Sequence, residues 1–382
     1  MEYRILGRTG LKVGAIALGC EGFADKTAEE VRADFDFAIR NGINFLDLYA
    51  SNPELRSNIG AALAGRREKF VIQGHLCSVW EEGQYLRTRD PEKSLAAFED
   101  LLARLGTDYV EIGMIHYVDA EADLREVLDG PIMRLAQRLR SEGRIRHIGL
   151  SSHNPVVAHM AARTGLIDVL MFSVNPCYDL LPPSDDVDTL WADESYAREL
   201  HNIDPERQRL YEFCEREGIA IDVMKAYGGG DLLSDANSPF GRPMTPVQCL
   251  EYALTRPGVA AVMAGCRNRA EIEAALAWCS ATAAERDYTG ALAGLDKFSW
   301  EGHCMYCGHC APCSVGIDIA GVNKYYNLTL AQHEIPETVR EHYRLLPHQA
   351  SECIACGRCE RNCPFGVDII GHMRLAAAKF GY

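Results

Sequence analysis

Four cysteines near the end of the chain have the spacing C-x2-C-x2-C-x3-C, and a proline follows the last of them. They are Cys353, Cys356, Cys359 and Cys363. Thiolates in such a run hold [4Fe–4S] clusters, and the fourth cysteine binds a different cluster from the first three. The spacing therefore predicts electron transfer, and it requires a second group of cysteines that completes both clusters.

The second group lies earlier in the sequence, with two residues between neighbouring members. They are Cys304, Cys307, Cys310 and Cys313. In this arrangement the last cysteine of each group binds the cluster that the other group holds. One cluster is then bound by Cys304, Cys307, Cys310 and Cys363, and the other by Cys353, Cys356, Cys359 and Cys313. Zinc is the competing interpretation, because C-x2-C pairs also bind tetrahedral zinc. The even spacing and the C-P ending suit zinc poorly, so two [4Fe–4S] clusters are the expected metal cofactors.

The composition indicates a globular protein with room for one large domain and a smaller one. The chain has 382 residues, of which 47% are hydrophobic and 24% are charged. Its formal net charge of -15 is unfavourable for nucleic acid and for anionic membranes, so neither is an expected partner. The N-terminus has no apolar signal segment, and no stretch reaches membrane-spanning length. We therefore expect a cytoplasmic protein whose thiols stay reduced.

Residues 1–290 alternate short β-branched runs with amphipathic segments of helix length, which predicts βα units around a parallel sheet. The eight predicted strands are residues 15–18, 43–48, 69–73, 109–115, 145–151, 168–174, 219–224 and 259–265. Eight units in a segment of this length predict an α/β fold of the (β/α)8 TIM-barrel type. A doubly wound open sheet is the alternative, but the G-x-G-x-x-G turn that it needs is missing after the first strand.

The barrel pattern stops near residue 295, and residues 295–382 form a second predicted domain that holds both cysteine groups. The spacer at 322–346 has a helical pattern and resembles helical ferredoxins. This domain is therefore expected to be small, ferredoxin-like and mainly helical. Within the barrel, the connection at 175–204 is unusually long. In a barrel it lies on the C-terminal face, where it is either a substrate lid or a solvated excursion.

Five segments of the barrel carry a family resemblance: YRILGRTGLKVGAIALG, GINFLDLYASNPELRSNIGAALAGRREKFVI, LGTDYVEIGMIHYVD, IRHIGLSSHNP and GVAAVMAGCRNRAEIEAAL. Along its whole length the barrel resembles the aldo/keto reductases, including their N-terminal hairpin. With the cysteine-rich tail, the chain resembles aldo/keto reductase–ferredoxin fusions of bacteria and archaea. The resemblance implies a redox reaction on a small carbonyl-type substrate in the barrel mouth.

In that family a nicotinamide delivers hydride, a tyrosine protonates the alkoxide, and a lysine–aspartate pair tunes the tyrosine while a histidine orients the substrate. The resemblance assigns Asp47 to the aspartate and His116 to the histidine. Asn52 stands at the tyrosine position and His75 at the lysine position. An amide cannot donate a useful proton, whereas an imidazole titrates near neutrality. We expect Asp47, His75 and His116 to form the catalytic face, and Tyr49, on the same side of its strand as Asp47, is the candidate replacement for the phenol.

The same resemblance implies a nicotinamide nucleotide site. The positions that hold the carboxamide, the pyrophosphate and the nucleotide end are occupied by Ser151, Ser152, His153, Gly228, Gly229, Gly230, Gly265 and Arg267. Gly265 and Glu271 replace the cations that bind the 2′-phosphate of NADP in the family. An acid repels phosphate, so NADPH is disfavoured unless Arg267 or Arg269 compensates, and NADH is the nicotinamide that remains.

Clusters carry single electrons and nicotinamide carries two, so a flavin is the usual converter between them. No clear flavin sequence is present, and this cofactor stays open. Three functions follow. The first is an oxidoreductase whose clusters exchange electrons between a ferredoxin-type partner protein and a small substrate. The second is an NADH-dependent carbonyl reductase with a structural or regulatory tail. The third is a non-catalytic electron-transfer subunit.

Overall fold

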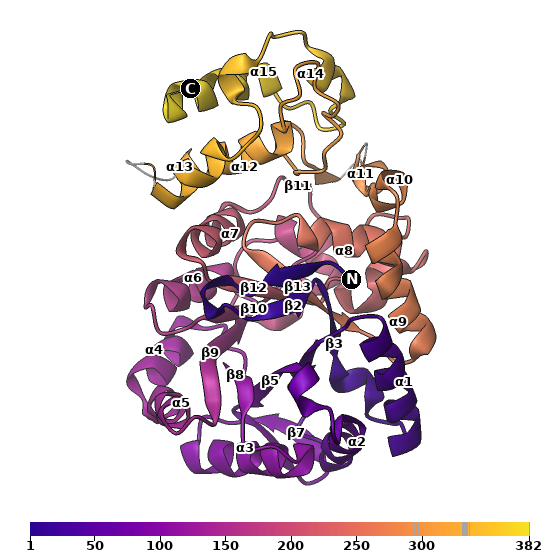
Figure 1. The fold of residues 1–382 in the computed structure, drawn as a ribbon, viewed down its shortest axis with the longest axis vertical. Helices are drawn as coiled ribbons and strands as arrows, with labels where there is room; N and C mark the ends of the chain where they lie inside the picture. Colours follow the sequence, from indigo (N-terminus) through magenta and orange to yellow (C-terminus); the bar gives the residue numbers. More distant parts are fainter. Residues whose placement is uncertain (294, 296–297, 331–334, 336, 382) are drawn as a thin grey trace.

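The structure, a computed structural model, describes residues 1–293, 295, 298–330, 335 and 337–381. Its centre is a closed parallel barrel of eight strands in the order β10-β12-β13-β3-β4-β5-β8-β9 (Figure 1). The strands are β3 (Ile16–Gly19), β4 (Phe45–Leu48), β5 (Val71–Leu76), β8 (Val110–Ile115), β9 (Ile145–Ser152), β10 (Val169–Ser173), β12 (Ala220–Met224) and β13 (Val259–Gly265). Each of them overlaps one predicted segment, which confirms the TIM barrel.

Helices surround the barrel on its outer side. They are α1 (Ala28–Arg40), α2 (Pro53–Leu63), α3 (Pro91–Leu105), α4 (Glu121–Asp129), α5 (Pro131–Ser141), α6 (Pro155–Arg163), α7 (Pro205–Glu217), α8 (Pro246–Leu254), α9 (Arg269–Leu276), α10 (Ala283–Arg286) and α11 (Thr289–Leu292). Five of them begin with proline after a residue whose side chain accepts hydrogen bonds from the first turn: Asn52, Asp90, Asn154, Asp204 and Thr245. This cap-and-proline pair fixes where each helix starts.

Two antiparallel hairpins modify the barrel. The first, β1 (Tyr3–Ile5) and β2 (Lys12–Gly14), was expected from the resemblance, and Leu6 and Val13 pack with the interior side chains of the strands. The second, β6 (Ser78–Glu81) and β7 (Gln84–Arg87), follows β5 and was not predicted. Its turn residues Glu82 and Gly83 both have positive φ, as a two-residue hairpin turn requires.

The tail is mainly helical, as predicted, and packs beside α7 and α8 (Figure 1). Its helices are α12 (Ile319–Leu330), α13 (Glu337–Arg344), α14 (Arg358–Asn362) and α15 (Ile369–Phe380). Within the spacer predicted to be helical, residues 331–334 and 336 lie outside the described residues. Lys324 of α12 forms an ion pair with Glu215 of α7 at 2.7 Å. The tail therefore contacts the barrel wall through specific polar groups.

The long connection after β10 is anchored at separate points, while most of residues 182–199 are half-buried or exposed. Tyr178, Leu181 and Leu190 are buried. Near its end, β11 (Leu200–His201) pairs in parallel with β14 (Phe298–Ser299), which leads into the tail. The connection is thus tied to the segment that joins barrel and tail.

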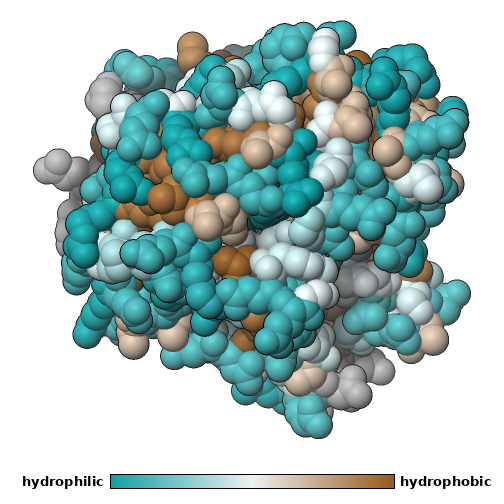
Figure 2. All heavy atoms as spheres, turned by 90° about the horizontal axis from the view of Figure 1, so that it is seen from below, coloured by the Kyte–Doolittle hydropathy of each residue, from teal (hydrophilic) through white to brown (hydrophobic). Residues whose placement is uncertain are grey.

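The face of the barrel opposite the tail is covered mostly by hydrophilic residues, with small separate apolar areas (Figure 2). Across the described part of the chain, no helix combines the length and the apolar character that crossing a bilayer requires.

Candidate functional site

Three predicted catalytic side chains meet at the C-terminal end of neighbouring strands. Asp47 lies on β4, His75 on β5 and His116 directly after β8, and these strands pair in this order. His75 Nε2 lies 2.9 Å from Asp47 Oδ1, and His75 Nδ1 lies 2.7 Å from His116 Nδ1. All three residues are buried. The structure therefore joins them into one hydrogen-bonded chain.

The two histidine nitrogens that face each other restrict the tautomers. A carboxylate only accepts, so His75 donates its Nε2–H to Asp47. With His75 neutral, its Nδ1 accepts from the Nδ1–H of His116, which leaves His116 Nε2 as a base. When His75 carries an additional proton, the direction reverses and His116 holds its proton on Nε2. Burial, with the neighbouring His75 second, lowers the pKa of His116 well below its usual value, so the base form prevails at rest.

Asp47 is held in place by Gln73, a residue that sequence reasoning missed. Gln73 Nε2 donates to Asp47 Oδ1 at 2.9 Å and to Asp222 Oδ2 of β12 at 3.0 Å inside the barrel. Burial, and secondarily the nearby Asp47, raises the pKa of Asp222 well above its usual value. Since residues 73 and 75 lie on one side of β5, strand alternation was the signal that could have found Gln73.

Three tyrosines surround His116, one of them the next residue, Tyr117, whose ring centroid lies 5.2 Å from that of the imidazole. The Tyr49 ring stacks on it with centroids 5.5 Å apart and planes 8° from parallel, so its ring and not its hydroxyl faces the imidazole. Burial and the Glu21 carboxylate raise the pKa of Tyr49, which is the opposite of activation by a cation. Tyr85 of β7, missed because its hairpin was not predicted, lies 5.4 Å from His116, centroid to centroid. Its Oη is buried and has no hydrogen-bond partner among the described residues.

Asn52 does not join this group. Its Oδ1 accepts from the backbone N–H groups of Glu54 and Leu55 at 2.9 and 3.1 Å and caps α2. The residue at the family's tyrosine position therefore has a structural role in this chain.

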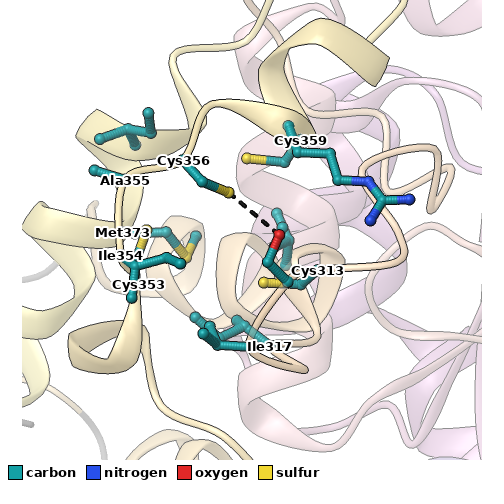
Figure 3. Close-up of a pocket in the computed structure, with 13 residues that line it drawn as sticks. Cys313, Ile317, Cys353, Ile354, Ala355, Cys356, Cys359 and Met373 are labelled. Carbon is teal, nitrogen blue, oxygen red and sulfur yellow. Dashed lines mark hydrogen bonds between the residues drawn. The ribbon is translucent and has the colours of Figure 1, made fainter.

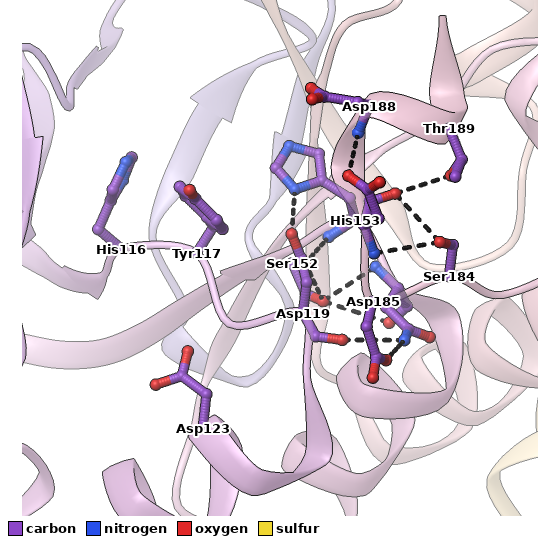
Figure 4. A network of polar contacts seen from close by, with 12 residues as sticks. His116, Tyr117, Asp119, Asp123, Ser152, His153, Ser184, Asp185, Asp188 and Thr189 are labelled. Atoms are coloured by element: carbon purple, nitrogen blue, oxygen red, sulfur yellow. Dashed lines mark hydrogen bonds and ion pairs between the residues drawn. The ribbon is translucent and has the colours of Figure 1, made fainter. Parts of the chain in front are cut away.

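Most side chains of the predicted carboxamide site are bonded to Asp119, which sequence reasoning missed (Figure 4). Ser152 Oγ donates to Asp119 Oδ1 at 3.1 Å, and His153 Nδ1 lies 2.9 Å from Asp119 Oδ2. Asn154 Nδ2 donates to Asp185 of the long connection at 3.0 Å, which anchors that connection to the end of β9. Within the described structure only Ser151, of the two serines, keeps a buried hydroxyl without a partner.

The remaining nucleotide residues lie on loops after β12 and β13. Gly228, Gly229 and Gly230 have positive φ of 59°, 71° and 108°, and a Cβ at Gly229 or Gly230 would meet no atom within 4 Å. Gly265 ends β13, and Arg267 is paired with Glu271 at 2.9 Å. These residues fit a nicotinamide nucleotide in part: the open glycine loop and Ser151 remain free, whereas Ser152, His153 and Arg267 are occupied.

The cysteines of the tail surround two hollows, with the membership that the exchanged pattern predicts. The outer site is lined by Cys313, Cys353, Cys356 and Cys359, with apolar walls from Ile317 and Met373 (Figure 3). The inner site, next to the barrel, is lined by Cys304, Cys307, Cys310 and Cys363. Each set draws three cysteines from one group and the fourth from the other.

The two hollows fit clusters better than single ions. Each hollow is lined by four cysteines, which is the number of thiolates that a [4Fe–4S] cluster takes. In the described ranges, no three His, Cys, Asp or Glu side chains converge closely enough to hold one metal ion, as zinc requires. Buried nitrogens beside the inner site have no hydrogen-bond partner in that part of the chain: Arg256 Nη1, His303 Nε2 and His309 Nδ1. Hydrogen-bond donors of this kind suit cluster sulfurs.

The exposure of the two sites differs. Burial raises the pKa of Cys304 in the inner site to about 12. Cys356 of the outer site is exposed, and a hydrogen bond with Ser314 Oγ at 3.4 Å is the main cause that lowers its pKa. The outer site is thus the one that a partner can approach.

Comparison with known families agrees with both halves of this architecture. Residues 11–246, more than half of the chain, match the model of the aldo/keto reductase family. Residues 303–368 match the model of a 4Fe-4S dicluster domain.

Curated relatives are oxidoreductases. One, an uncharacterised oxidoreductase of Bacillus subtilis, is 28% identical over 45% of this chain and 56% of the relative. An L-galactose dehydrogenase of Arabidopsis thaliana is 28% identical over 48% and 61% of the two chains, and an L-glyceraldehyde 3-phosphate reductase of Escherichia coli is 30% identical over 41% and 46%. The chain thus spans about half the length of the curated relatives it matches.

Solved structures show the same fold. The holo form of an aldo-keto reductase from Bacillus halodurans has a TM-score of 0.57 and 23% identity over 75% of this chain and 94% of its own.

Proposed function

Because the chain belongs to the aldo/keto reductase family and its tail matches a 4Fe-4S dicluster domain, we propose that it is an oxidoreductase that couples two [4Fe–4S] clusters to the reduction or oxidation of a small carbonyl-type substrate in the barrel mouth. The Asp47–His75–His116 chain is the observation that carries this proposal, since it supplies an acid–base group where the family's tyrosine is replaced. The inner and outer cysteine sets would hold the clusters, which supply one-electron transfer when bound.

His116 Nε2 is the group that exchanges a proton with the substrate oxygen. Reduction of a carbonyl takes up two electrons, which the clusters would supply, and two protons. In the form that carries the additional proton, His116 donates its Nε2 proton to the oxygen while its Nδ1 takes one from His75, whose remaining N–H stays directed at Asp47. The second proton, which goes to the carbon, comes from solvent. During oxidation the same shifts run backwards. Gln73 holds the Asp47 carboxylate beside His75, so the hydrogen bonds of the Asp47–His75–His116 chain are kept in both reduction and oxidation. A positioned acid–base group of this kind contributes about 10² to 10⁴ in rate.

The substrate class follows from the groups around His116. Tyr85 Oη, without a partner among the described residues, can donate to a carbonyl or hydroxyl oxygen next to the imidazole. The rings of Tyr49, Tyr85 and Tyr117 leave an aromatic wall suited to a small organic molecule. The exposed Cys356 side of the outer site is the face for a ferredoxin-type redox partner in the cytoplasm.

An NADH-dependent carbonyl reductase is the second candidate, because the glycine loop after β12 is open and Ser151 keeps a free hydroxyl for a carboxamide. A flavin would then be needed as converter if NADH also reduced the clusters. The occupied Ser152, His153 and Arg267 count against this candidate.

An anaerobic reductive titration separates the candidates. We expect dithionite or a reduced ferredoxin to bleach the clusters and produce their EPR signal, whereas NADH leaves them oxidised. Bleaching by NADH would instead establish a working nicotinamide site and a converter. Full reduction by ferredoxin without turnover of any aldehyde, ketone or alcohol would favour a non-catalytic electron-transfer subunit.

A further inference from the structure

The two cysteine sites differ in their charged surroundings, and one buried residue accounts for the difference. Resting on the two-cluster function proposed above, we propose that Arg256 makes the inner site the more readily reduced of the two, which favours an added electron residing beside the barrel.

Arg256 is fixed against the loop of the inner site. It follows α8 and is 2% exposed. Its Nη2 donates to the backbone carbonyl of Met305, which lies between Cys304 and Cys307. The Tyr288 hydroxyl donates to the same carbonyl at 2.7 Å and accepts from Arg256 Nη2 at 3.2 Å. A barrel residue thus places its cation on the carbonyl of Met305, which is one residue from Cys304 and two from Cys307.

The charge of Arg256 is not neutralised by a neighbouring carboxylate. Among the described residues it forms no ion pair, and its Nη1 has no hydrogen-bond partner. Asp179 and Glu215 nearby have cations of their own, in the pairs Asp179–Arg207 at 3.5 Å and Glu215–Lys324 at 2.7 Å. One net positive charge therefore faces the inner site.

Aromatic side chains keep water away from this cation. The guanidinium carbon lies 4.6 Å from the centroid of the Tyr252 ring and 5.4 Å from that of Tyr306, and both residues are buried. Charges in such surroundings interact several times more strongly than in water. An electron added to the inner site is stabilised by this interaction.

Two effects compete in setting the order of the two sites. Burial alone would make the inner site harder to reduce, because added negative charge is poorly solvated there. At the outer site water solvates the charge, since Cys356 is exposed, and it also screens the exposed Arg358 and Arg361. The unscreened contact of Arg256 outweighs the loss of solvation, and the inner site has the higher midpoint.

The test is an EPR-monitored redox titration of the full chain, purified anaerobically, with dithionite as the reductant. Cys356→Ser identifies the outer signal because it changes one ligand of that site. Arg256→Met, similar in length but uncharged, should lower the inner midpoint and leave the outer midpoint within error of the native value. Arg256→Lys keeps the charge and should restore most of the shift. Lys324→Met removes a cation at the same interface that Glu215 already neutralises, and should move either midpoint much less.

Full iron content with both midpoints unchanged in Arg256→Met would overturn the role of Arg256, and so would a native inner midpoint below the outer one. If Arg256→Met loses iron, Tyr288→Phe decides: it keeps the charge but removes one anchor, and should lower the inner midpoint by a smaller amount, whereas no shift contradicts the proposal. Zinc, or far fewer than about eight irons in the native chain, contradicts the two-cluster function itself, which separates the two failures.

Discussion

In the barrel mouth the reactive side chains are bonded to one another, whereas in the tail most of them are not. Asp47, His75 and His116 form an unbroken chain of hydrogen bonds. Of the eight tail thiols, Cys356 has the one hydrogen bond to another side chain found in the described structure, with Ser314. The mouth therefore has its geometry before anything binds. The tail surrounds two hollows, each lined by four cysteines drawn from both groups.

The difference implies that the two regions respond differently to single changes. A preorganised hydrogen-bonded site loses chemistry when one member is removed, but the barrel around it keeps its core. A site built around a bound metal group loses the group and then its local fold, because binding free energy is also folding free energy there.

The largest effect is therefore expected from a tail cysteine. Cys356→Ala should remove the outer cluster, lowering iron by about half, and unfold the segments around it. Iron analysis and limited proteolysis of the tail measure both consequences. Cys279→Ala, a barrel cysteine outside both sites, is the matched control and should keep full iron. Retention of all iron and of a protected tail in Cys356→Ala would show that the outer site does not depend on this ligand.

In the mouth, the expected loss is in turnover and not in structure. His116→Ala should lower kcat/KM by about 10² to 10⁴ while iron content and thermal unfolding stay close to native values. His159→Ala on α6, away from the mouth, serves as the control histidine. Activity within a factor of about three of native in His116→Ala would place the chemistry elsewhere in the chain.

The same contrast explains what could be predicted from the sequence. Barrel strands and tail cysteines are local patterns: the alternation of apolar runs with amphipathic segments was enough to find all eight strands, and the cysteine spacing was enough to find both groups of cysteines. The resemblance also placed Asp47 and His116. Tyr85, Asp119 and Arg256 were missed because their roles arise from contacts between distant segments. Arg256 lies far from Cys304 in sequence, and only the contact between the segment after α8 and the loop at Met305 brings its charge to the inner site.

Helix α7 lies between the two regions and carries a pH-sensitive group. Burial raises the pKa of Glu212 from 4.5 to about 7, partly offset by a hydrogen bond from Gln208. Because its pKa is raised in the folded protein, Glu212 contributes its full share to the free energy of unfolding below pH 4.5. This contribution is lost as pH rises through about 7. At about 1.4 kcal/mol per pH unit the loss is about 3 kcal/mol.

Glu212→Gln cannot ionise and should escape this loss. Its stability relative to native should rise by about 2.5 kcal/mol between pH 5 and pH 8, measured by chemical unfolding at both values. Glu273→Gln on the exposed side of α9 should change stability equally at both pH values. An equal difference for Glu212→Gln at both would show that Glu212 is not buried as described.

The smallest expected effect tests whether Asn52, at the position of the family's tyrosine, belongs to the mouth at all. Its Oδ1 caps α2 through two backbone N–H groups, so Asn52→Ala should cost about 1 kcal/mol of stability. Asn52→Asp keeps the acceptor and should remain near native stability. Both variants should turn over substrate at the native rate, because the chemistry runs through His116. A tenfold loss of kcat in Asn52→Ala with native stability would move Asn52 into the reactive group, and the mouth would then extend beyond the chain of Asp47, His75 and His116.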